Sequence, residues 1–216
     1  MNYSTIASSN ILKDWLRPEY IEDFECGVLH KRWCHEVPFK YAVLPNLFLS
    51  SIIQSITEYC HTIPVTKARI EGISSHTNWY WGAFNYLEVV KFIYSKHFQS
   101  FLFELLGERL IMKASLIPQY NVFQASSQGI PIHTDYGRPV NFVSLLQLSK
   151  QHKPNWGGEL IFYREEQGKL VAFESIIPQS NTFIIFKVCP NSYHSVSDLQ
   201  QYWIRENIAF DWCVTP

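Results

Sequence analysis

The clearest indication of the fold is the stretch PVNFVSLLQLSKQHKPNWGGELIFYREEQGKLVAFESIIPQSNTFIIFKV, residues 139–188. It contains short runs rich in β-branched and aromatic residues, separated by segments that contain proline, glycine or asparagine. Similar runs lie outside it, at residues 110–117, 119–123 and 202–212. Seven or eight strands in roughly 105 residues fit a double-sheet jelly roll, which is also called a double-stranded β-helix.

Helices are expected ahead of these strands. Residues 47–59 and 86–106 carry apolar side chains at three- and four-residue spacing, and Gly107 follows the second segment as a helix-ending residue. The predicted fold class is therefore α+β, a jelly-roll core with N-terminal supporting helices. The length and the lack of a linker predict a single domain, 1–216. In it, residues 1–109 are mostly helical and residues 110–216 form the jelly-roll core.

The charge pattern argues against several classes of partner. The formal net charge is −1 and basic residues are interspersed with acidic ones, which predicts neither nucleic acid nor an anionic membrane as partner. No apolar run reaches the roughly 18 residues of a membrane-spanning helix, and residues 1–12 lack the pattern of a secretion signal. The 5 cysteines are an odd number and widely spread, which favours reduced thiols. We therefore expect a soluble, cytoplasmic protein.

His133 and Asp135 are the first candidate metal ligands. They lie in GIPIHTDYG at the end of an expected extended segment, where side chains two residues apart point to the same side. This pair alone is weak evidence, but His194 follows another expected strand, in CPNSYHSVS. Two histidines and one carboxylate form a facial triad, which binds iron(II) on one side and leaves the other side open. The alternative for His194 is a turn histidine that caps a backbone carbonyl.

Arg205 is the candidate anion-binding residue. It lies in WIRENIAFDW, an otherwise largely apolar expected strand, where a guanidinium is costly to bury unless it meets an anion. A carboxylate of a ligand would fit its planar fork. The alternative is an ion pair within the protein, with one of three carboxylates: Glu159, Glu174 or Asp211.

In chain order, these features resemble the 2-oxoglutarate and iron(II)-dependent oxygenase superfamily, and within it the prolyl-4-hydroxylase-like group. The matching text is QYNVF (119–123), PIHTD (131–135), NWGGELIFY (155–163), NTFIIFKVCPNSYHSV (181–196) and RENIAFDW (205–212), a little under half of the chain. The resemblance implies that His133, Asp135 and His194 bind iron. It further implies that Arg205 binds the far carboxylate of 2-oxoglutarate, and that Tyr120 supports that carboxylate. The implied cofactors are Fe(II), 2-oxoglutarate as co-substrate and O2, with ascorbate as a supporting reductant.

The reaction implied by the resemblance is hydroxylation of an unactivated C–H bond, with decarboxylation of 2-oxoglutarate to succinate. A carboxylate at Asp135 favours hydroxylation over halogenation, while desaturation and ring closure remain open. We expect a small-molecule substrate, such as an amino acid or a natural-product intermediate. A prolyl hydroxylase acting on a peptide or protein is the nearest alternative. A non-catalytic jelly-roll module that binds metal or acts as a sensor is the alternative of another class.

Four further features carry weaker predictions. The aromatic segment HTNWYW, residues 76–81, lies either in the core or on the substrate side of the pocket. Arg138 either pairs with a substrate carboxylate or is a solvated loop residue. Gly157 and Gly158 are expected to let the chain turn into the next strand. A C-x3-H-x3-C-H cluster has spacing unlike familiar zinc sites, which favours a scatter of unrelated residues: Cys26, His30, Cys34 and His35.

Overall fold

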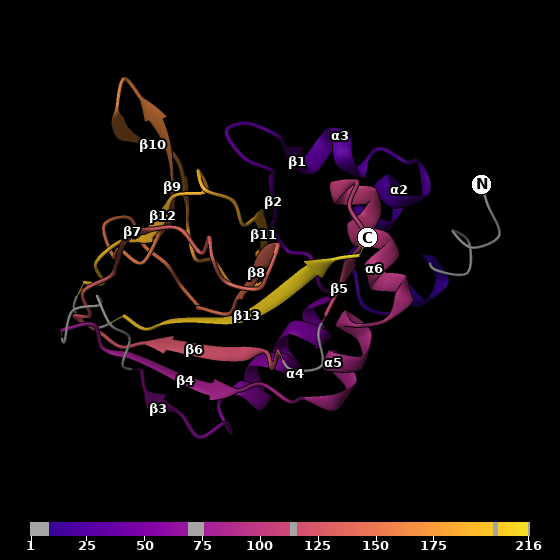
Figure 1. The fold of residues 1–216 in the computed structure, drawn as a ribbon. Helices are drawn as coiled ribbons and strands as arrows, with labels where there is room; N and C mark the ends of the chain where they lie inside the picture. Colours follow the sequence, from indigo (N-terminus) through magenta and orange to yellow (C-terminus); the bar gives the residue numbers. More distant parts are fainter. Residues whose placement is uncertain (1–8, 69–75, 113–115, 201–202, 216) are drawn as a thin grey trace.

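The computed structural model describes residues 9–68, 76–112, 116–200 and 203–215. It contains a large and a small antiparallel sheet packed face to face, and Figure 1 shows the helices gathered beside the large sheet, away from the small one. This arrangement confirms the predicted α+β class with a double-stranded β-helix core. None of the helices in these described ranges is long and apolar enough to cross a membrane.

The two sheets are ordered as follows. The large sheet runs β1 (Cys34–His35), β2 (Tyr41–Leu44), β11 (Phe183–Lys187), β8 (Phe142–Gln147), β13 (Arg205–Val214), β6 (Gln119–Phe123), β4 (Trp79–Ala83) and β3 (Thr66–Lys67), with β5 (Leu110–Ile111) beside β13. The small sheet runs β10 (Lys169–Ile176), β9 (Leu160–Glu166), β12 (His194–Val196) and β7 (Ile130–His133).

The N-terminal region contributes strands as well as helices. Strand β2 pairs with β11 and strand β4 pairs with β6, so the large sheet extends on both sides of the core strands. The sequence predicted a mostly helical region here, and it missed these strands because each is only four or five residues long. Of the expected strand at 110–117, only residues 110–111 form a strand, β5; residues 112, 116 and 117 lie in no strand, and residues 113–115 lie outside the described residues.

The labelled helices are α2 (Pro18–Glu25), α3 (Leu29–Trp33), α4 (Ser50–Cys60), α5 (Leu87–Ile93) and α6 (Lys96–Leu106). Helix α4 matches the expected helix at 47–59 to within three residues. The expected helix at 86–106 is divided in two, because the Ser95 hydroxyl accepts a hydrogen bond from the Phe98 backbone and starts α6. Gly107, with φ of 72°, ends α6 as the sequence predicted.

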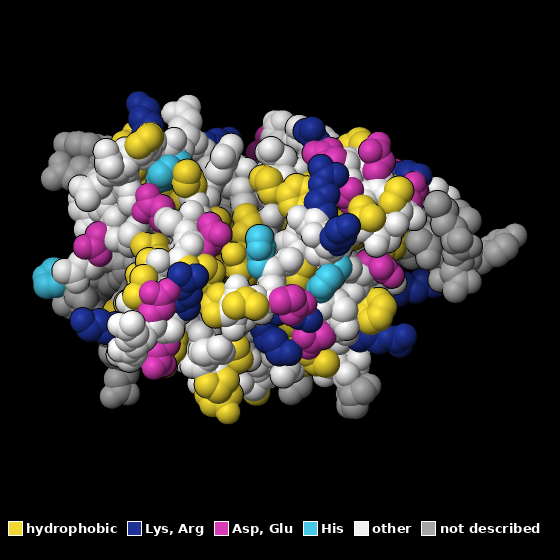
Figure 2. All heavy atoms as spheres, turned by 90° about the horizontal axis from the view of Figure 1, so that it is seen from above, with side chains coloured by type: hydrophobic (Ala, Val, Ile, Leu, Met, Phe, Trp, Pro, Cys, Tyr) yellow, Lys and Arg dark blue, Asp and Glu magenta, His cyan; other side chains and the backbone are white. Residues whose placement is uncertain are grey.

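Strand alternation places apolar side chains of the large sheet in two separate hydrophobic clusters, one on each face. On β11, Phe183 and Ile185 pack in the core shared with the helices, while Ile184 and Phe186 pack between the two sheets. Such a strand is buried on both faces, which explains its continuous apolar sequence. On the face shown in Figure 2, acidic and basic side chains are interspersed without a patch of one sign.

Candidate metal centre

A cavity of about 150 Å³ lies between the two sheets. Its floor comes from alternate residues of the large sheet, and its other wall comes from β7, β9 and β12 of the small sheet. Polar and charged side chains line it at intervals among apolar ones, so the cavity is a potential ligand site.

His133, Asp135 and His194 meet at this cavity. His133 ends β7 and His194 begins β12, and the two residues are direct partners across these antiparallel strands. The potential ligand atoms of all three residues lie within 4.8 Å of one another, and His194 Nε2 is 3.7 Å from Asp135 Oδ2. The three side chains named from the sequence can therefore hold one metal ion.

Both histidines present the same ring nitrogen to this position. His133 Nδ1 lies 2.8 Å from the Pro131 carbonyl oxygen, and His194 Nδ1 lies 3.0 Å from the Ser192 carbonyl oxygen. Because a carbonyl only accepts, each Nδ1 carries the proton and each Nε2 keeps a free lone pair. Burial, and next the proximity of His133, lowers the pKa of His194 to about 4. His194 is therefore neutral near pH 7, as a metal ligand must be.

The carboxylate of Asp135 is oriented by Arg138. Arg138 Nη1 donates to Asp135 Oδ1 at 3.0 Å, and Arg138 Nη2 donates to Asp211 Oδ2 at 2.5 Å. Gly137, with φ of 101°, provides the turn that brings Arg138 back toward Asp135. Arg138 therefore bridges two aspartates, an arrangement that neither interpretation from the sequence included.

Arg205 is buried at the inner part of the cavity. It is 1% exposed, and its Nε and Nη2 have no hydrogen-bond partner in the described part of the chain. The guanidinium lies 5.2 Å from the centre of the Phe123 ring. Burial lowers the pKa of Arg205 to about 10, and the negative charge of Glu159 partly offsets this effect. The side chain remains a cation near pH 7, with donors that await an acceptor.

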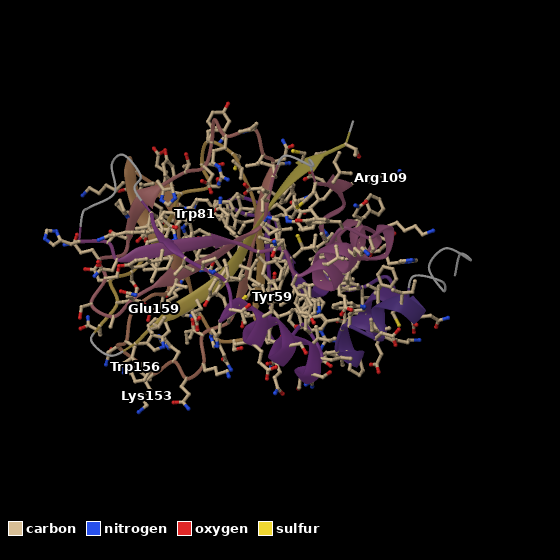
Figure 3. The ribbon with its side chains drawn as sticks, turned by 90° about the horizontal axis from the view of Figure 1, so that it is seen from below. Tyr59, Trp81, Arg109, Lys153, Trp156 and Glu159 are labelled. Carbon is tan, nitrogen blue, oxygen red and sulfur yellow. The ribbon has the colours of Figure 1, made fainter. Side chains whose placement is uncertain are left out.

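The internal ion pairs considered for Arg205 do not form. Glu159 contacts His152 and Ser197, and in Figure 3 it lies with Trp156 and Lys153 at the strand end of the molecule. Glu174 accepts a hydrogen bond from a tyrosine, and Asp211 is bound by Arg138. Within the described part of the chain, no carboxylate oxygen lies within 4.0 Å of the Arg205 guanidinium.

Two further buried polar side chains lie near Arg205 and were missed from the sequence. Among residues 9–68, 76–112, 116–200 and 203–215, the Gln147 amide nitrogen and oxygen and the Trp203 indole nitrogen have no hydrogen-bond partner. Gln147 is the cross-strand partner of Asn207, two residues from Arg205 on the same face of the sheet. A polar residue in the apolar run FVSLLQ was the signal available in the sequence. Each of these side chains therefore has a buried donor without a partner, as Arg205 does.

Tyr120 lies on the wrong face of β6 for its expected role. Its neighbours Gln119 and Asn121 line the cavity, whereas Tyr120 packs in the core beneath the helices. Its hydroxyl donates to the Glu206 carboxylate on that side. Because successive side chains of a strand point to opposite faces, Tyr120 does not reach the cavity, and the assignment from the resemblance is corrected here.

The aromatic segment at 76–81 divides between the cavity and the surface. Trp79 lines the cavity, stacks on Phe123 with ring centroids 5.6 Å apart, and donates through Nε1 to Asn121 Oδ1 at 3.0 Å. Trp81 is 42% exposed. Trp79 thus belongs to the cavity wall, and the segment is neither wholly core nor wholly pocket.

Gly158 allows the close packing around Arg205. Its φ is +79°, and a Cβ there would lie 2.4 Å from the Trp203 ring and 3.2 Å from Arg205 Cδ. At Gly157, a Cβ would lie 1.7 Å from the Asp198 carbonyl oxygen. Both glycines therefore have the structural role expected from the sequence.

A second group of potential ligand atoms lies near α3. His30, Cys34 and Glu36 approach one another within 4.8 Å, while Cys26 and His35 are not part of this group. His30 Nε2 is 3.2 Å from Glu36 Oε1, and Lys40 Nζ is 3.5 Å from the same oxygen. Glu36 is thus already neutralised, and burial raises the pKa of Cys34 to about 11.

The comparisons with solved structures agree with the fold described above. Three solved structures share the fold at low identity. A prolyl hydroxylase from Trichoplax adhaerens, in complex with a hypoxia inducible factor peptide, has a TM-score of 0.63 and 14% identity over 99% of this chain and 93% of its own. A Pseudomonas putida prolyl-4-hydroxylase has a TM-score of 0.62 and 12% identity, over 87% of this chain and 97% of its own. An alpha-ketoglutarate-dependent epimerase from nogalamycin biosynthesis has a TM-score of 0.60 and 9% identity, over 91% of this chain and 83% of its own.

The comparison with curated protein sequences found no match to this chain. Residues 112–210 match the family model of the 2OG-Fe(II) oxygenase superfamily, and this range contains the His133, Asp135 and His194 cluster and Arg205. The part of the chain that carries the candidate site is therefore similar to the 2OG-Fe(II) oxygenase superfamily.

Proposed function

We propose that this protein is a dioxygenase that hydroxylates an unactivated C–H bond of a small molecule and converts 2-oxoglutarate to succinate. Its superfamily uses Fe(II), 2-oxoglutarate and O2. The observation that carries the proposal is the buried guanidinium of Arg205, which lines the same cavity as the His-Asp-His cluster and has free donors. A protein that only bound metal would have no need for this uncompensated cation.

The residues present fit the expected cofactors. His133, Asp135 and His194 would hold the iron, since two imidazoles and one carboxylate are a donor set for Fe(II). When bound, iron with 2-oxoglutarate and O2 supplies the oxidising power for C–H cleavage. Arg205 would hold the far carboxylate of 2-oxoglutarate, with Gln147 and Trp203 as neighbouring donors.

The protein itself would orient the reactants and exclude water. Apolar side chains from both sheets, Val143, Leu145 and Leu160, line the cavity. They would shield the co-substrate from solvent, which strengthens the electrostatic interactions of Arg205. His133 and His194 are hydrogen-bonded to backbone carbonyls, and Asp135 is hydrogen-bonded to Arg138. The ligand atoms would therefore be oriented before metal binds.

The polar part of the cavity wall supports a small substrate with hydrogen-bonding groups. Trp79 Nε1 donates to Asn121 Oδ1, and Asn121 Nδ2 donates to Asn207 Oδ1 at 3.2 Å, so the three side chains form one fixed chain across β4, β6 and β13. Such a rigid polar floor suits the recognition of a small polar molecule. Ring closure and desaturation use the same site and are distinguished by their products.

A prolyl hydroxylase acting on a peptide is the second candidate. One structural neighbour was solved with a peptide bound, which favours this alternative at the level of the fold. In this chain, β7 is the outer strand of the small sheet beside the metal position. Pro131 removes one backbone donor from that strand, so an added peptide strand would gain fewer hydrogen bonds there. The missing backbone donor at Pro131 therefore favours a small-molecule substrate over a peptide.

The first test is the release of succinate from 2-oxoglutarate by the purified protein with Fe(II) and ascorbate. We expect slow turnover without substrate, and no turnover in His133→Ala or Asp135→Ala, because each change removes a metal ligand. Full activity in either variant at limiting iron would contradict the metal roles. Absence of turnover in the wild-type protein, with metal and 2-oxoglutarate shown to bind, would favour the non-catalytic module.

The second test identifies the substrate class. Amino acids, natural-product intermediates and proline-containing peptides are incubated separately with the protein, and products are analysed by mass spectrometry. We expect the gain of one oxygen in a small molecule and a matching increase in succinate release. Oxidation of a peptide alone would identify the second candidate as correct.

A further inference from the structure

Arg138 is the centre of a charge arrangement at the mouth of the cavity. Its Nη1 binds Asp135 Oδ1 at 3.0 Å, and its Nη2 binds Asp211 Oδ2 at 2.5 Å. Asp135 follows β7 of the small sheet and Asp211 lies on β13 of the large sheet. One guanidinium thus joins the two sheets and separates two carboxylates that both line the cavity.

The two oxygens of Asp135 are distinct as a result. Oδ1 is bound by Arg138, while Oδ2 is the oxygen 3.7 Å from His194 Nε2. Oδ2 is therefore the oxygen better placed to bind a metal, because Oδ1 already accepts a charge-assisted hydrogen bond from Arg138. Asp211 is held by the same guanidinium and is not part of the cluster of potential ligand atoms around His133 and His194.

This selection matters because a facial site must keep one side of the metal open. Without the Arg138 contact, Asp135 can bind the metal through both oxygens, as carboxylates do. Asp211 would also lose the cation that holds it. A second Asp135 oxygen on the metal would occupy a position that a chelating ligand needs, and a released Asp211 carboxylate would compete with such a ligand in the same cavity.

We propose that Arg138 is a positioning residue that makes Asp135 a single-oxygen ligand and holds Asp211 away from the metal, thereby keeping positions open for the co-substrate. The inference rests on the proposed function, since it requires metal at His133, Asp135 and His194. The planar fork of arginine can bind two carboxylates at once with a fixed geometry, which a lysine ammonium cannot do as rigidly. Asp211 in turn anchors Arg138 to the large sheet.

The test uses Co(II) in place of Fe(II), because its visible absorption reports the number and kind of metal ligands. Wild-type protein and Arg138→Met are titrated first with Co(II) and then with 2-oxoglutarate. All three ligands remain in Arg138→Met, so we expect Co(II) to bind with a changed spectrum. We expect the 2-oxoglutarate concentration for half-saturation to rise by about tenfold, as when only about a tenth of the sites are open to the ligand.

Further variants separate positioning from other roles. Arg138→Lys should fall between wild type and Arg138→Met, because it keeps the charge but loses the fork. Asp211→Asn should show a smaller change of the same kind, and it leaves the turn at 135–138 intact should Arg138→Met fold poorly. Arg164→Met is the matched control, since Arg164 forms an exposed pair with Glu166 and should behave as wild type.

The outcomes distinguish two failures. If the wild-type Co(II) spectrum is unaffected by His133→Ala, the metal assignment fails and the proposed function fails with it. If that spectrum requires His133 but folded Arg138→Met and Asp211→Asn both retain the wild-type spectrum and 2-oxoglutarate dependence, only the role of Arg138 is overturned. Loss of Co(II) binding in folded Arg138→Met also overturns it, because the residue would then be needed to hold the metal.

Discussion

Arg205→Met tests the residue that separates a 2-oxoglutarate enzyme from other proteins with a similar metal site. The change keeps most of the side-chain length and removes the charge and the donors. Arg205 is 1% exposed and has no carboxylate partner among the residues that the structure describes, so the interaction with a bound carboxylate would be shielded from water. Removing one partner of such a buried pair costs roughly 2 to 5 kcal/mol. The co-substrate requirement should therefore rise roughly 30-fold to several thousand-fold.

Arg205→Met should weaken co-substrate binding, but it should not lower the stability of the protein without ligand. An uncompensated buried cation destabilises the protein without ligand, because its desolvation is not offset by an ion pair. We therefore expect Arg205→Met to unfold at the same or a higher temperature than wild type in the absence of 2-oxoglutarate. Added 2-oxoglutarate, with Mn(II) to fill the metal site, should stabilise wild type and have little effect on the variant.

The assays are the 2-oxoglutarate dependence of succinate release and thermal unfolding with and without ligand. Arg109→Met is the matched control, because the Arg109 guanidinium also lies over a phenylalanine ring, 5.5 Å from the centre of Phe103. Figure 3 shows Arg109 far from Glu159, the carboxylate whose charge acts on Arg205. Arg205→Lys should be milder than Arg205→Met. Unchanged 2-oxoglutarate dependence together with a lowered unfolding temperature would refute the reasoning and identify Arg205 as a structural cation.

Three other changes test the site from different directions. Gly158→Ala should destabilise the protein by about 1 to 3 kcal/mol more than Gly168→Ala in urea unfolding, because only the former Cβ meets other side chains. Tyr120→Phe should cost about 1 to 3 kcal/mol through the lost bond to Glu206 and leave the 2-oxoglutarate dependence unchanged. The pKa of His194 is lowered to about 4, so the unfolded state binds a proton first as the pH falls. In the metal-free protein, His194 should therefore not lower the free energy of unfolding above about pH 6.5, and it should lower that free energy progressively as the pH falls toward 4.

Each of these has a contrary result. Equal losses in both glycine variants would mean that backbone strain alone acts at the two positions, which share a positive φ. A raised 2-oxoglutarate requirement in Tyr120→Phe would restore the role expected from the resemblance. A His194→Gln variant with the wild-type slope of stability against pH between 4 and 6.5 would show that this histidine does not contribute to it.

The fold class was predictable from the sequence, and so were most of the residues that line the candidate site. Short β-rich runs are strong local signals, and the pattern in chain order brought out His133, Asp135, His194 and Arg205 without a structure. These residues stand out because a charged or metal-binding side chain at the end of an apolar strand is costly unless it has a ligand. The helical segments were also visible, although the cap at Ser95 that divides the second one was not used.

The tertiary structure decided which face each strand turns to the cavity. Strand β6 has buried residues on both of its faces. Alternation therefore predicts that Tyr120 and Asn121 point to opposite faces of the sheet, but not which of them faces the cavity. The same reason hid Gln147 among apolar neighbours. Arg138 and Asp211 are 73 residues apart, and only the packing of the two sheets brings them together. Contacts of this kind depend on the register and spacing of sheets, which are set by the whole core and not by any local run of residues.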